Sequence, residues 1–389
     1  MYNISIDEKE LLQVLKDMIS IESVNPSLCP GGAGEAKIAE YIGNYLKSIG
    51  LDVKYQEINK GRVNVIGILK GSGGGKSLML NGHTDTVSIE GMDIEPLNPV
   101  YKDGKVYGRG SIDMKGGLAS MIGAAKALIN GNIKLKGDVY FTFVADEEYE
   151  SIGTEEIVKE YKADGAVVCE PTDLKVCVAH KGFAWIKIEI FGKAAHGSIP
   201  QYGVDAILKA GKILSEIDKL SESLLNSKKH KLLGTPSVHC SIIKGGTELS
   251  TYPYYCTIEI ERRTIPGESY ETVNEEIKNI LDKIASGDTD FKCKYEIFFH
   301  RPPLEVSLEE PVVKVLMEVA GDIYKKEPGI MGMSGWLDSS ILDKASIPAV
   351  IFGPSGEGLH AATEYVDFAS VVDTSKVLAN TIIKFCGSV

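Results

Sequence analysis

The sequence predicts an α/β protein of two domains, and three observations lead to this prediction. The chain has 389 residues, which is more than one ordinary domain needs. Helical and strand-like patterns alternate at both ends of the chain, as in a layered α/β domain with a mixed sheet. Between about His180 and His300 the pattern changes to strands separated by long helices, so this middle part is expected to form a separate α+β domain.

The first part of the chain begins with an expected amphipathic helix, because Leu11, Leu15 and Met18 recur at helical spacing. A second helix is expected over residues 35–49, ending at Gly50. The strands and the small-residue helix that follow are expected over residues 63–69, 77–80, 114–129, 139–144 and 166–168. The middle domain is expected to hold strands at 184–191, 238–243 and 256–260 and helices at 204–225 and 270–284. The last part holds the alternating elements 312–324, 336–343 and 349–352.

Composition and charge disfavour several classes of protein. A content of 43% hydrophobic and 25% charged residues is that of an ordinary globular protein, and no stretch reaches the ~18 consecutive apolar residues of a membrane helix. The net charge of −12 disfavours nucleic acid and anionic membranes as partners, because both are bound through clustered Lys and Arg. The N-terminal segment lacks the features of a signal peptide and the cysteines form no CxxC pair, so a cytoplasmic protein with free thiols is expected.

The first of three groups of chemically active residues is the pair His83 and Asp85, which directly follows an apolar strand. In extended backbone, residues two apart point to the same face. The carboxylate of Asp85 can therefore fix the imidazole of His83 and leave its other nitrogen for a metal. Taken alone, a histidine at the end of a strand is more often a polar surface residue.

The second group surrounds Asp113, in the run Gly108-Arg-Gly110-Ser-Ile-Asp113-Met-Lys-Gly-Gly117 before the small-residue helix. One explanation of Asp113 is that it caps this helix. A cap does not explain glycines on both sides, which indicate a backbone packed where no side chain fits. Both a cap and a metal ligand therefore remain open for Asp113.

The third group is Asp146-Glu147-Glu148, at the end of the strand over residues 139–145. Three adjacent carboxylates repel one another, so an isolated triple is more often a solvated turn. The alternative is that one of them binds a cation while its neighbour acts as a general base. Two further residues follow predicted strands in the same way: Glu170 after the run 166–168, and His360 after the last strand and a Gly/Pro turn.

Together these groups supply two imidazoles and three carboxylates, and one glutamate of the pair Glu147 and Glu148 is left unassigned. Such a set suits two divalent metals that share one carboxylate and lie ~3.5–4 Å apart. Oxygen and nitrogen ligands without thiolate favour Zn, Co or Mn. The sequence has no GxSxG elbow and no cysteine in a recognisable catalytic setting, which disfavours a covalent nucleophile.

With these motifs the sequence resembles the M20 metallopeptidase family (the ArgE/DapE, aminoacylase-1 and carboxypeptidase G2 group) from the first helix to about Val366. The resemblance implies a di-metal catalytic domain over residues 1–179 and 295–389, with a lid and dimerisation domain inserted at 180–294. By the same resemblance, His83 is expected to bind one metal, with Asp85 orienting its imidazole. Asp113 is expected to bridge the two metals. The resemblance also makes Glu147 the general base, and the remaining ligands are Glu148, Glu170 and His360.

Two residues of the lid carry over from the same resemblance. His196, in Gly192-Lys-Ala-Ala-His196-Gly-Ser-Ile-Pro200, resembles the histidine that polarises the scissile carbonyl in the partner subunit's active site. An exposed turn residue is the alternative for His196. Arg263, shortly before Pro266-Gly-Glu268, resembles the arginine that grips the substrate carboxylate, a task that suits a bidentate guanidinium. Arg262 is the competing choice.

The implied function is hydrolysis of the amide bond of an N-acyl amino acid. The implied assembly is a homodimer with two divalent metals per chain, and zinc is the metal expected first. N-acetylornithine is the first expected substrate, N-succinyl-diaminopimelate the second, and aminoacylase or dipeptidase activity the third. A metal-binding homologue without hydrolase activity is the alternative from another class. Relatives often carry Asn where Ser250 stands and Gly-Thr-Asp where Trp336-Leu-Asp338 stands. Both departures fall where the family contacts substrate. The acyl group and the amino-acid side chain of the substrate are therefore not determined by the resemblance.

Overall fold

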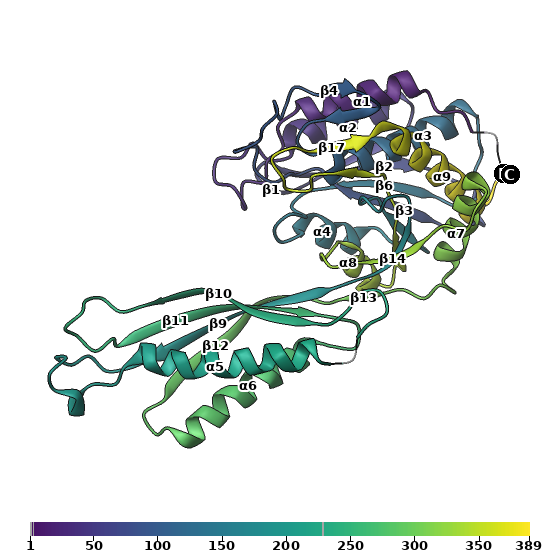
Figure 1. The fold of residues 1–389 in the computed structure, drawn as a ribbon. Coiled ribbons are helices and arrows are strands. Elements are labelled where there is room, and N and C mark those ends of the chain that lie inside the picture. Colours follow the sequence, from purple (N-terminus) through teal and green to yellow (C-terminus); the bar gives the residue numbers. More distant parts are fainter. Residues whose placement is uncertain (1, 3, 228) are drawn as a thin grey trace. The chain divides into compact units, whose positions relative to one another are not determined.

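The computed structural model describes residues 2, 4–227 and 229–389, and the chain forms two compact units (Figure 1). The first unit consists of Met1–Val178, Val306–Met331 and Leu337–Val389, and the second consists of Ala179–Glu305 and Gly332–Trp336. The first unit is built on a mixed sheet with helices, and the second on a four-stranded sheet with two long helices. The mixed α/β fold class predicted from the sequence is therefore confirmed.

The core of the first unit is a mixed sheet in the order β1-β2-β6-β3-β7-β15-β8. Its strands are β1 (Asp52–Asn59), β2 (Arg62–Leu69), β6 (Val139–Val144), β3 (Leu78–His83), β7 (Ala166–Val168), β15 (Ala349–Ile351) and β8 (Val176–His180). β3 is parallel to β6 and β7, and β7 is parallel to β15, whereas β1, β2 and β8 run antiparallel to their neighbours. The parallel strands are almost wholly buried and mostly apolar, as expected where helices cover both faces, with the polar Asn81 and His83 at the end of β3.

Helices cover this sheet (Figure 1), and their residues explain where they begin and how closely they pack. They are α1 (Glu8–Ser20), α2 (Ala36–Ser48), α3 (Gly116–Asn130), α4 (Ile152–Glu160), α7 (Pro311–Tyr324), α8 (Ser339–Lys344) and α9 (Phe368–Cys386). α1 begins after Asp7, whose carboxylate accepts a hydrogen bond from the amide of Glu10. α3 packs against α9 so closely that a Cβ at Gly123 would lie 2.7 Å from the hydroxyl of Ser375.

A small sheet in the first unit, in the order β16-β17-β5-β4, organises two loops. Its strands are β4 (Val100–Lys102), β5 (Lys105–Tyr107), β16 (Gly356–Glu357) and β17 (Tyr365–Asp367). β17 pairs antiparallel with β5. Because β5 leads directly into residues 108–115 and residues 358–364 lead directly into β17, this pairing places the two loops side by side.

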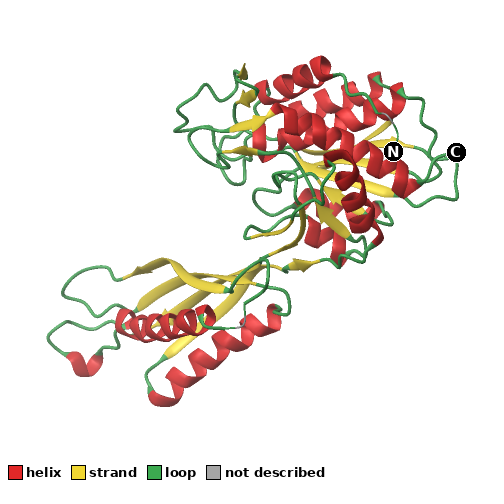
Figure 2. Cartoon of the chain, turned by 45° about the vertical axis from the view of Figure 1, so that its right-hand side comes forward, coloured by secondary structure: helices red, strands yellow, loops and turns green. Residues whose placement is uncertain are grey.

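The second unit is an antiparallel sheet in the order β10-β11-β9-β12, with α5 and α6 on one face (Figure 2). Its elements are β9 (Gly182–Phe191), α5 (Ala206–Leu225), β10 (Ser237–Gly245), β11 (Tyr255–Thr264), α6 (Tyr270–Gly287) and β12 (Lys292–Arg301). Two short strands, β13 (Leu304–Glu305) and β14 (Ile330–Met333), lie where the chain passes between the units. Buried Ile186, Ile188 and Ile190 of β9 alternate with partly exposed residues, and the buried side chains pack under the helices.

One domain and one helix differ from their predicted bounds. The domain expected over residues 180–294 runs on to Glu305, because β12 pairs with β9 over almost its whole length. The element expected over residues 336–343 is the shorter helix α8, which begins only at Ser339.

Two properties of the described residues bear on the class of protein. None of the helices over residues 2, 4–227 and 229–389 combines the length and hydrophobicity that crossing a membrane requires. The seven cysteines, all of which are described, are free thiols.

Candidate metal centre

His83 is the last residue of β3, and its side chain is buried. Its Nδ1 lies 2.9 Å from the main-chain oxygen of Asp85, so Nδ1–H donates this hydrogen bond and the tautomer is fixed. Nε2 then faces carboxylate oxygens of Asp113 at 3.1 Å and Glu170 at 3.4 Å. Burial opposes the charged form of His83, but the nearby carboxylates, Glu170 first, raise the pKa of its imidazole well above the ordinary value, so a metal bound at Nε2 would replace a proton there.

Asp85 lies beside His83 and also supports a neighbouring turn, while its predicted role in orienting His83 stays a prediction. The hydrogen bond that orients His83 goes to the main chain of Asp85, and the carboxylate oxygen Oδ1 lies 3.6 Å from Nδ1. The carboxylate accepts hydrogen bonds from the amides of Glu147 and Glu148, both at 3.2 Å, and from Nδ2 of Asn25 at 2.7 Å. Asp85 therefore fixes the backbone of the turn that carries the two glutamates.

Asp113 lies in an irregular turn, Ser111–Lys115, directly before α3, and its φ of −117° and ψ of 91° are not helical. Gly110 precedes this turn with a φ of +79°, which glycine adopts without strain. Within the described residues, α3 has no side-chain capping hydrogen bond, so a cap does not account for Asp113. Its carboxylate oxygens lie 3.1 Å from Nε2 of His83 and 3.3 Å from Nε2 of His360.

The structure brings the five residues predicted as ligands together in two overlapping groups. His83, Asp113 and Glu170 form one group, and Asp113, Glu148 and His360 form the other. Within each group the ligand atoms lie within 4.8 Å of one another, and Asp113 belongs to both. Two cations bridged by one carboxylate fit this arrangement. Because the ligands are nitrogen and oxygen atoms, Zn, Co or Mn suits them.

Glu147 lies beside these groups, and neither of the two groups found among the described residues includes it. Its Oε2 is 3.9 Å from Nε2 of His83. Burial raises the pKa of Glu147 well above its ordinary value; nearby His83 opposes the shift, and the charge of Glu170 adds to it. A carboxyl group with a raised pKa beside a metal site can take up and return a proton near neutral pH.

The charges of the site favour a cation. Burial raises the pKa of Glu170 well above its ordinary value and that of Glu148 to about 7. Hydrogen bonds to Asp113 and Glu148 raise the pKa of His360 to about 10. Oε1 of Glu148 is buried without a hydrogen-bond partner in the described part of the chain. A divalent cation would satisfy this oxygen and offset the repulsion among the carboxylates.

A buried polar network supports the glutamate turn, and the sequence prediction missed it. Nε and Nη2 of Arg62 donate to Glu35 at 2.7 and 2.8 Å, and Nη2 also donates to Asp146 at 2.5 Å. Nδ2 of Asn25 donates to both Asp85 and Asp146. Asp146 has a φ of +72°, a strained conformation that these contacts hold in place. No local spacing links these residues, so only the tertiary fold reveals the network.

Of the two neighbouring arginines in the second unit, Arg263 is the accessible one. Arg262 is buried, and its guanidinium donates to the carboxylates of Glu268 and Glu276. Arg263 is partly exposed and donates to Glu261 at 2.7 Å. A ligand carboxylate can therefore reach Arg263 but not Arg262.

His196 is an exposed residue of the second unit. Its Nδ1 lies 2.7 Å from the hydroxyl of Ser198. The expected roles of His196 and Arg263 at the metal centre stay predictions, because both residues belong to the second unit while the metal centre belongs to the first.

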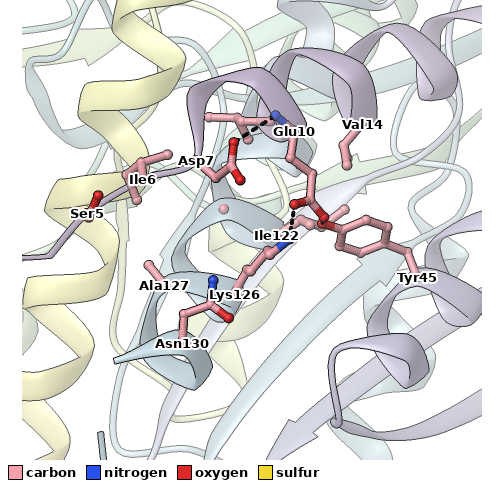
Figure 3. Close-up of a pocket in the computed structure, with 12 residues that line it drawn as sticks. Ser5, Ile6, Asp7, Glu10, Val14, Tyr45, Ile122, Lys126, Ala127 and Asn130 are labelled. Atoms are coloured by element: carbon pink, nitrogen blue, oxygen red, sulfur yellow. Dashed lines mark hydrogen bonds and ion pairs between the residues drawn. The ribbon is translucent and has the colours of Figure 1, made fainter. Parts of the chain in front are cut away.

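A small cavity elsewhere in the first unit is too small to bind a substrate (Figure 3). It lies between α1 and α3, where Glu10 forms an ion pair with Lys126 and accepts a hydrogen bond from the hydroxyl of Tyr45. Its volume of about 20 Å³ has room for about one water molecule. This cavity belongs to the packing of α1 and includes none of the residues of the metal centre.

Comparisons with known proteins extend over nearly the whole chain. Residues 79–384 match the sequence pattern of peptidase family M20/M25/M40. N-formyl-4-amino-5-aminomethyl-2-methylpyrimidine deformylase of Bacillus subtilis is 28% identical, over 97% of this chain and 95% of its own. Acetylornithine deacetylase of Myxococcus xanthus is 29% identical, over 84% of this chain and 85% of its own. The crystal structure of a tripeptidase from Staphylococcus aureus has a similar fold, with a TM-score of 0.79 at 23% identity over 98% of this chain and 99% of that chain.

Proposed function

Because this chain belongs to peptidase family M20/M25/M40 and is therefore a hydrolase, we propose that it cleaves the amide bond of N-acyl amino acids with two divalent cations. The observation that carries the proposal is that Asp113 is shared between two groups of ligands. A shared carboxylate suits two cations that lie ~3.5–4 Å apart. Zinc is the proposed metal, and Co or Mn is the alternative that the same ligands accept.

The proposed mechanism gives Glu147 the role of general base. The two ligand groups that share Asp113 would hold the two cations, whose chemistry when bound would be to lower the pKa of a water molecule and to polarise a carbonyl. Glu147 lies 3.9 Å from Nε2 of His83 and outside both ligand groups, so its carboxylate is available to accept the proton of the attacking water. The raised pKa of Glu147 helps it hold that proton until the leaving amine accepts it. Asp85 keeps Glu147 and Glu148 in place through their amides.

We assign two further roles to the second unit. His196 would donate a hydrogen bond to the substrate carbonyl, and Arg263 would bind the substrate carboxylate. These roles come from the family resemblance. The partial exposure of Arg263, compared with the buried and doubly paired Arg262, supports the choice between the two arginines.

N-acetylornithine is the first substrate that we propose. The acetylornithine deacetylase and the deformylase to which this chain is similar are both named for the removal of a small acyl group. Identities of 28–29% leave the acyl group open, so N-succinyl-diaminopimelate and aminoacylase or dipeptidase substrates are the alternatives. A metal-binding homologue without activity is disfavoured, because Glu147 is present beside the ligand groups.

A homodimer in the cytoplasm is the proposed assembly and location. β10 is an edge strand of the second unit, and its Ile242 and Ile243 are exposed. Leu208 of the neighbouring helix α5 is also exposed. Exposed apolar residues on an unpaired edge strand favour pairing with a second copy of the chain. The free thiols of the seven cysteines suit a reducing compartment.

Replacing Glu147 with glutamine tests the proposal. Glutamine keeps the size of the side chain but cannot accept the proton, so kcat for N-acetyl-L-ornithine should fall about 100- to 10,000-fold. The metal content, measured by mass spectrometry, should stay at that of the unchanged chain. Glu160→Gln is the matched control, because Glu160 is an exposed carboxylate at the end of α4. Unchanged turnover in Glu147→Gln, or loss of metal together with activity, would contradict the role of Glu147.

A further inference from the structure

A buried ion pair joins the two loops that the small sheet places side by side. Nη1 of Arg109 lies 2.7 Å from Oε2 of Glu364, and both side chains are buried. Arg109 lies in the loop that leads to Asp113, and Glu364 lies in the loop that follows His360. Neither residue belongs to the two ligand groups found among the described residues. The ion pair therefore connects the two loops that carry metal ligands without supplying a ligand itself.

Glu364 holds the backbone of the segment that carries Asp113. Its Oε2 accepts hydrogen bonds from Arg109 and from the amide of Gly110, the latter at 3.0 Å. Its Oε1 accepts from the amides of Ile112 at 3.0 Å and Asp113 at 3.2 Å. Each carboxylate oxygen therefore accepts two hydrogen bonds, and charge-assisted bonds of this kind are strong. A neutral side chain with one oxygen could not make all four.

Arg109 holds the loop that carries His360. Its Nη2 donates to the main-chain oxygen of Ala361 at 3.2 Å, and its Nε donates to that of Ser88 at 2.9 Å. His360 is half exposed and has a φ of +59°, which a residue other than glycine keeps only when its surroundings support it. Ala361 and Glu364 are therefore two anchors of the loop close to the ligand.

We infer that Arg109 and Glu364 are positioning residues that set the distance between Asp113 and His360. Nε2 of His360 lies 3.3 Å from Oδ2 of Asp113 in the group completed by Glu148. The ion pair thus determines how tightly this group, named here the outer group, binds its cation. The group of His83, Asp113 and Glu170, named the inner group, shares Asp113 but takes His83 from the end of β3 and does not include His360, so it should lose less affinity than the outer group without the ion pair. This inference rests on the proposed function, because it requires two cations.

The test is a titration of cations into chelator-stripped protein, read as the number of cations bound and the affinity of each step. In Glu364→Gln the amide nitrogen would face two N–H donors, so the loop that carries Asp113 should shift. We expect the cation of the outer group to bind about 10- to 100-fold more weakly, the range seen when outer partners of metal ligands are changed. The cation of the inner group, which shares only Asp113 with the outer group, should weaken by a clearly smaller factor. Glu276→Gln is the matched control, because Glu276 also pairs with a buried arginine, Arg262 of the second unit.

A second variant keeps the test decisive if Glu364→Gln does not fold, as judged by circular dichroism. Arg109→Lys keeps the positive charge but loses the fork of donors that reaches Ala361 and Ser88, so it should also weaken the cation of the outer group more than that of the inner group. Equal weakening of both cations, or two cations bound as tightly as in the unchanged chain, would overturn the inference. If the unchanged chain itself binds fewer than two cations, the proposed function fails instead.

Discussion

Replacing Arg62 with methionine would leave two buried carboxylates without the cation that they share. The Arg62 side chain is 7% exposed, and those of Glu35 and Asp146 are 0% and 2% exposed. The guanidinium makes four hydrogen bonds: two to Glu35, one to Asp146 and one to the hydroxyl of Ser27. Removing one partner of a buried ion pair costs about 3–5 kcal/mol, because the remaining charge stays desolvated. We expect Arg62→Met to lower the free energy of unfolding by this amount at pH 8.

The loss of unfolding free energy in Arg62→Met should be smaller at lower pH, because Glu35 becomes protonated there. Burial and the charge of Asp85 raise the pKa of Glu35 to about 7, although Arg62 opposes the shift. Without Arg62 this pKa rises further. A carboxyl group whose pKa is higher in the folded state destabilises that state as the pH rises from its ordinary pKa of 4.5 through the folded value. Arg62→Met should therefore lose less stability at pH 5.5 than at pH 8.

Urea unfolding followed by far-ultraviolet circular dichroism at both pH values measures this change. Tryptophan fluorescence is less suitable, because Trp185 and Trp336 both lie in the second unit and Arg62 lies in the first. The double variant Arg62→Met/Glu35→Gln should recover part of the loss, since it removes one of the uncompensated charges. An exposed ion pair contributes at most about 1 kcal/mol. A loss of unfolding free energy below this value at pH 8 would refute the reasoning, and so would equal losses at both pH values.

Three further predictions concern other parts of the structure. Asp85→Asn places an amide nitrogen against amide donors, so metal affinity should fall about 10- to 100-fold in a cation titration; unchanged affinity would show that Asp85 does not hold the site. Burial lowers the pKa of His180 from 6.5 to about 4, so the unfolded chain gains a proton there first as the pH falls. Stability should then drop by up to about 3 kcal/mol between pH 6.5 and pH 4, and a His180→Asn variant with the same pH dependence would exclude His180 as the cause. Gly117→Ala would place a Cβ 2.0 Å from the carbonyl oxygen of Cys169 and should cost about 1–3 kcal/mol in thermal or urea unfolding. Gly211→Ala has no described atom within 4 Å of its Cβ and should stabilise α5 by up to about 1 kcal/mol, so equal effects of the two changes would contradict the packing argument.

Part of the site could be predicted because its residues follow parallel strands. His83 ends β3, Glu147 and Glu148 follow β6, and Glu170 follows β7, with β3 parallel to both neighbours. The carboxyl ends of parallel strands meet at one edge of a sheet, so residues that follow them gather there. Most residues of these strands are apolar, a pattern that a sequence shows plainly.

The rest of the site depends on contacts that leave no local pattern. Asp113 and His360 lie on loops, and the pairing of β5 with β17 brings these loops together across about 250 residues of chain. Arg62 and Glu35 look like ordinary surface charges in the sequence, and only the fold buries them against Asp146.

The boundary between the two domains also depends on a tertiary contact, the pairing of strand β12. Its residues Lys292 and Lys294 alternate with Cys293, Tyr295 and Ile297, a pattern typical of a strand with one exposed face. Such a strand could belong to either domain. Only its pairing with β9 decides, which is why the predicted boundary at residue 294 falls inside it.

Free-amine release from N-acetyl-L-ornithine, measured against the number of cations bound per chain, tests the central claim most directly. Chelator-stripped protein would be titrated with zinc, and N-succinyl-diaminopimelate and a panel of N-acyl amino acids and dipeptides would be assayed in parallel. The account predicts that stripped protein is inactive and that turnover of one of these substrates appears as the second cation binds. Turnover by stripped protein, or no turnover of any of these amides with two cations bound, would contradict it.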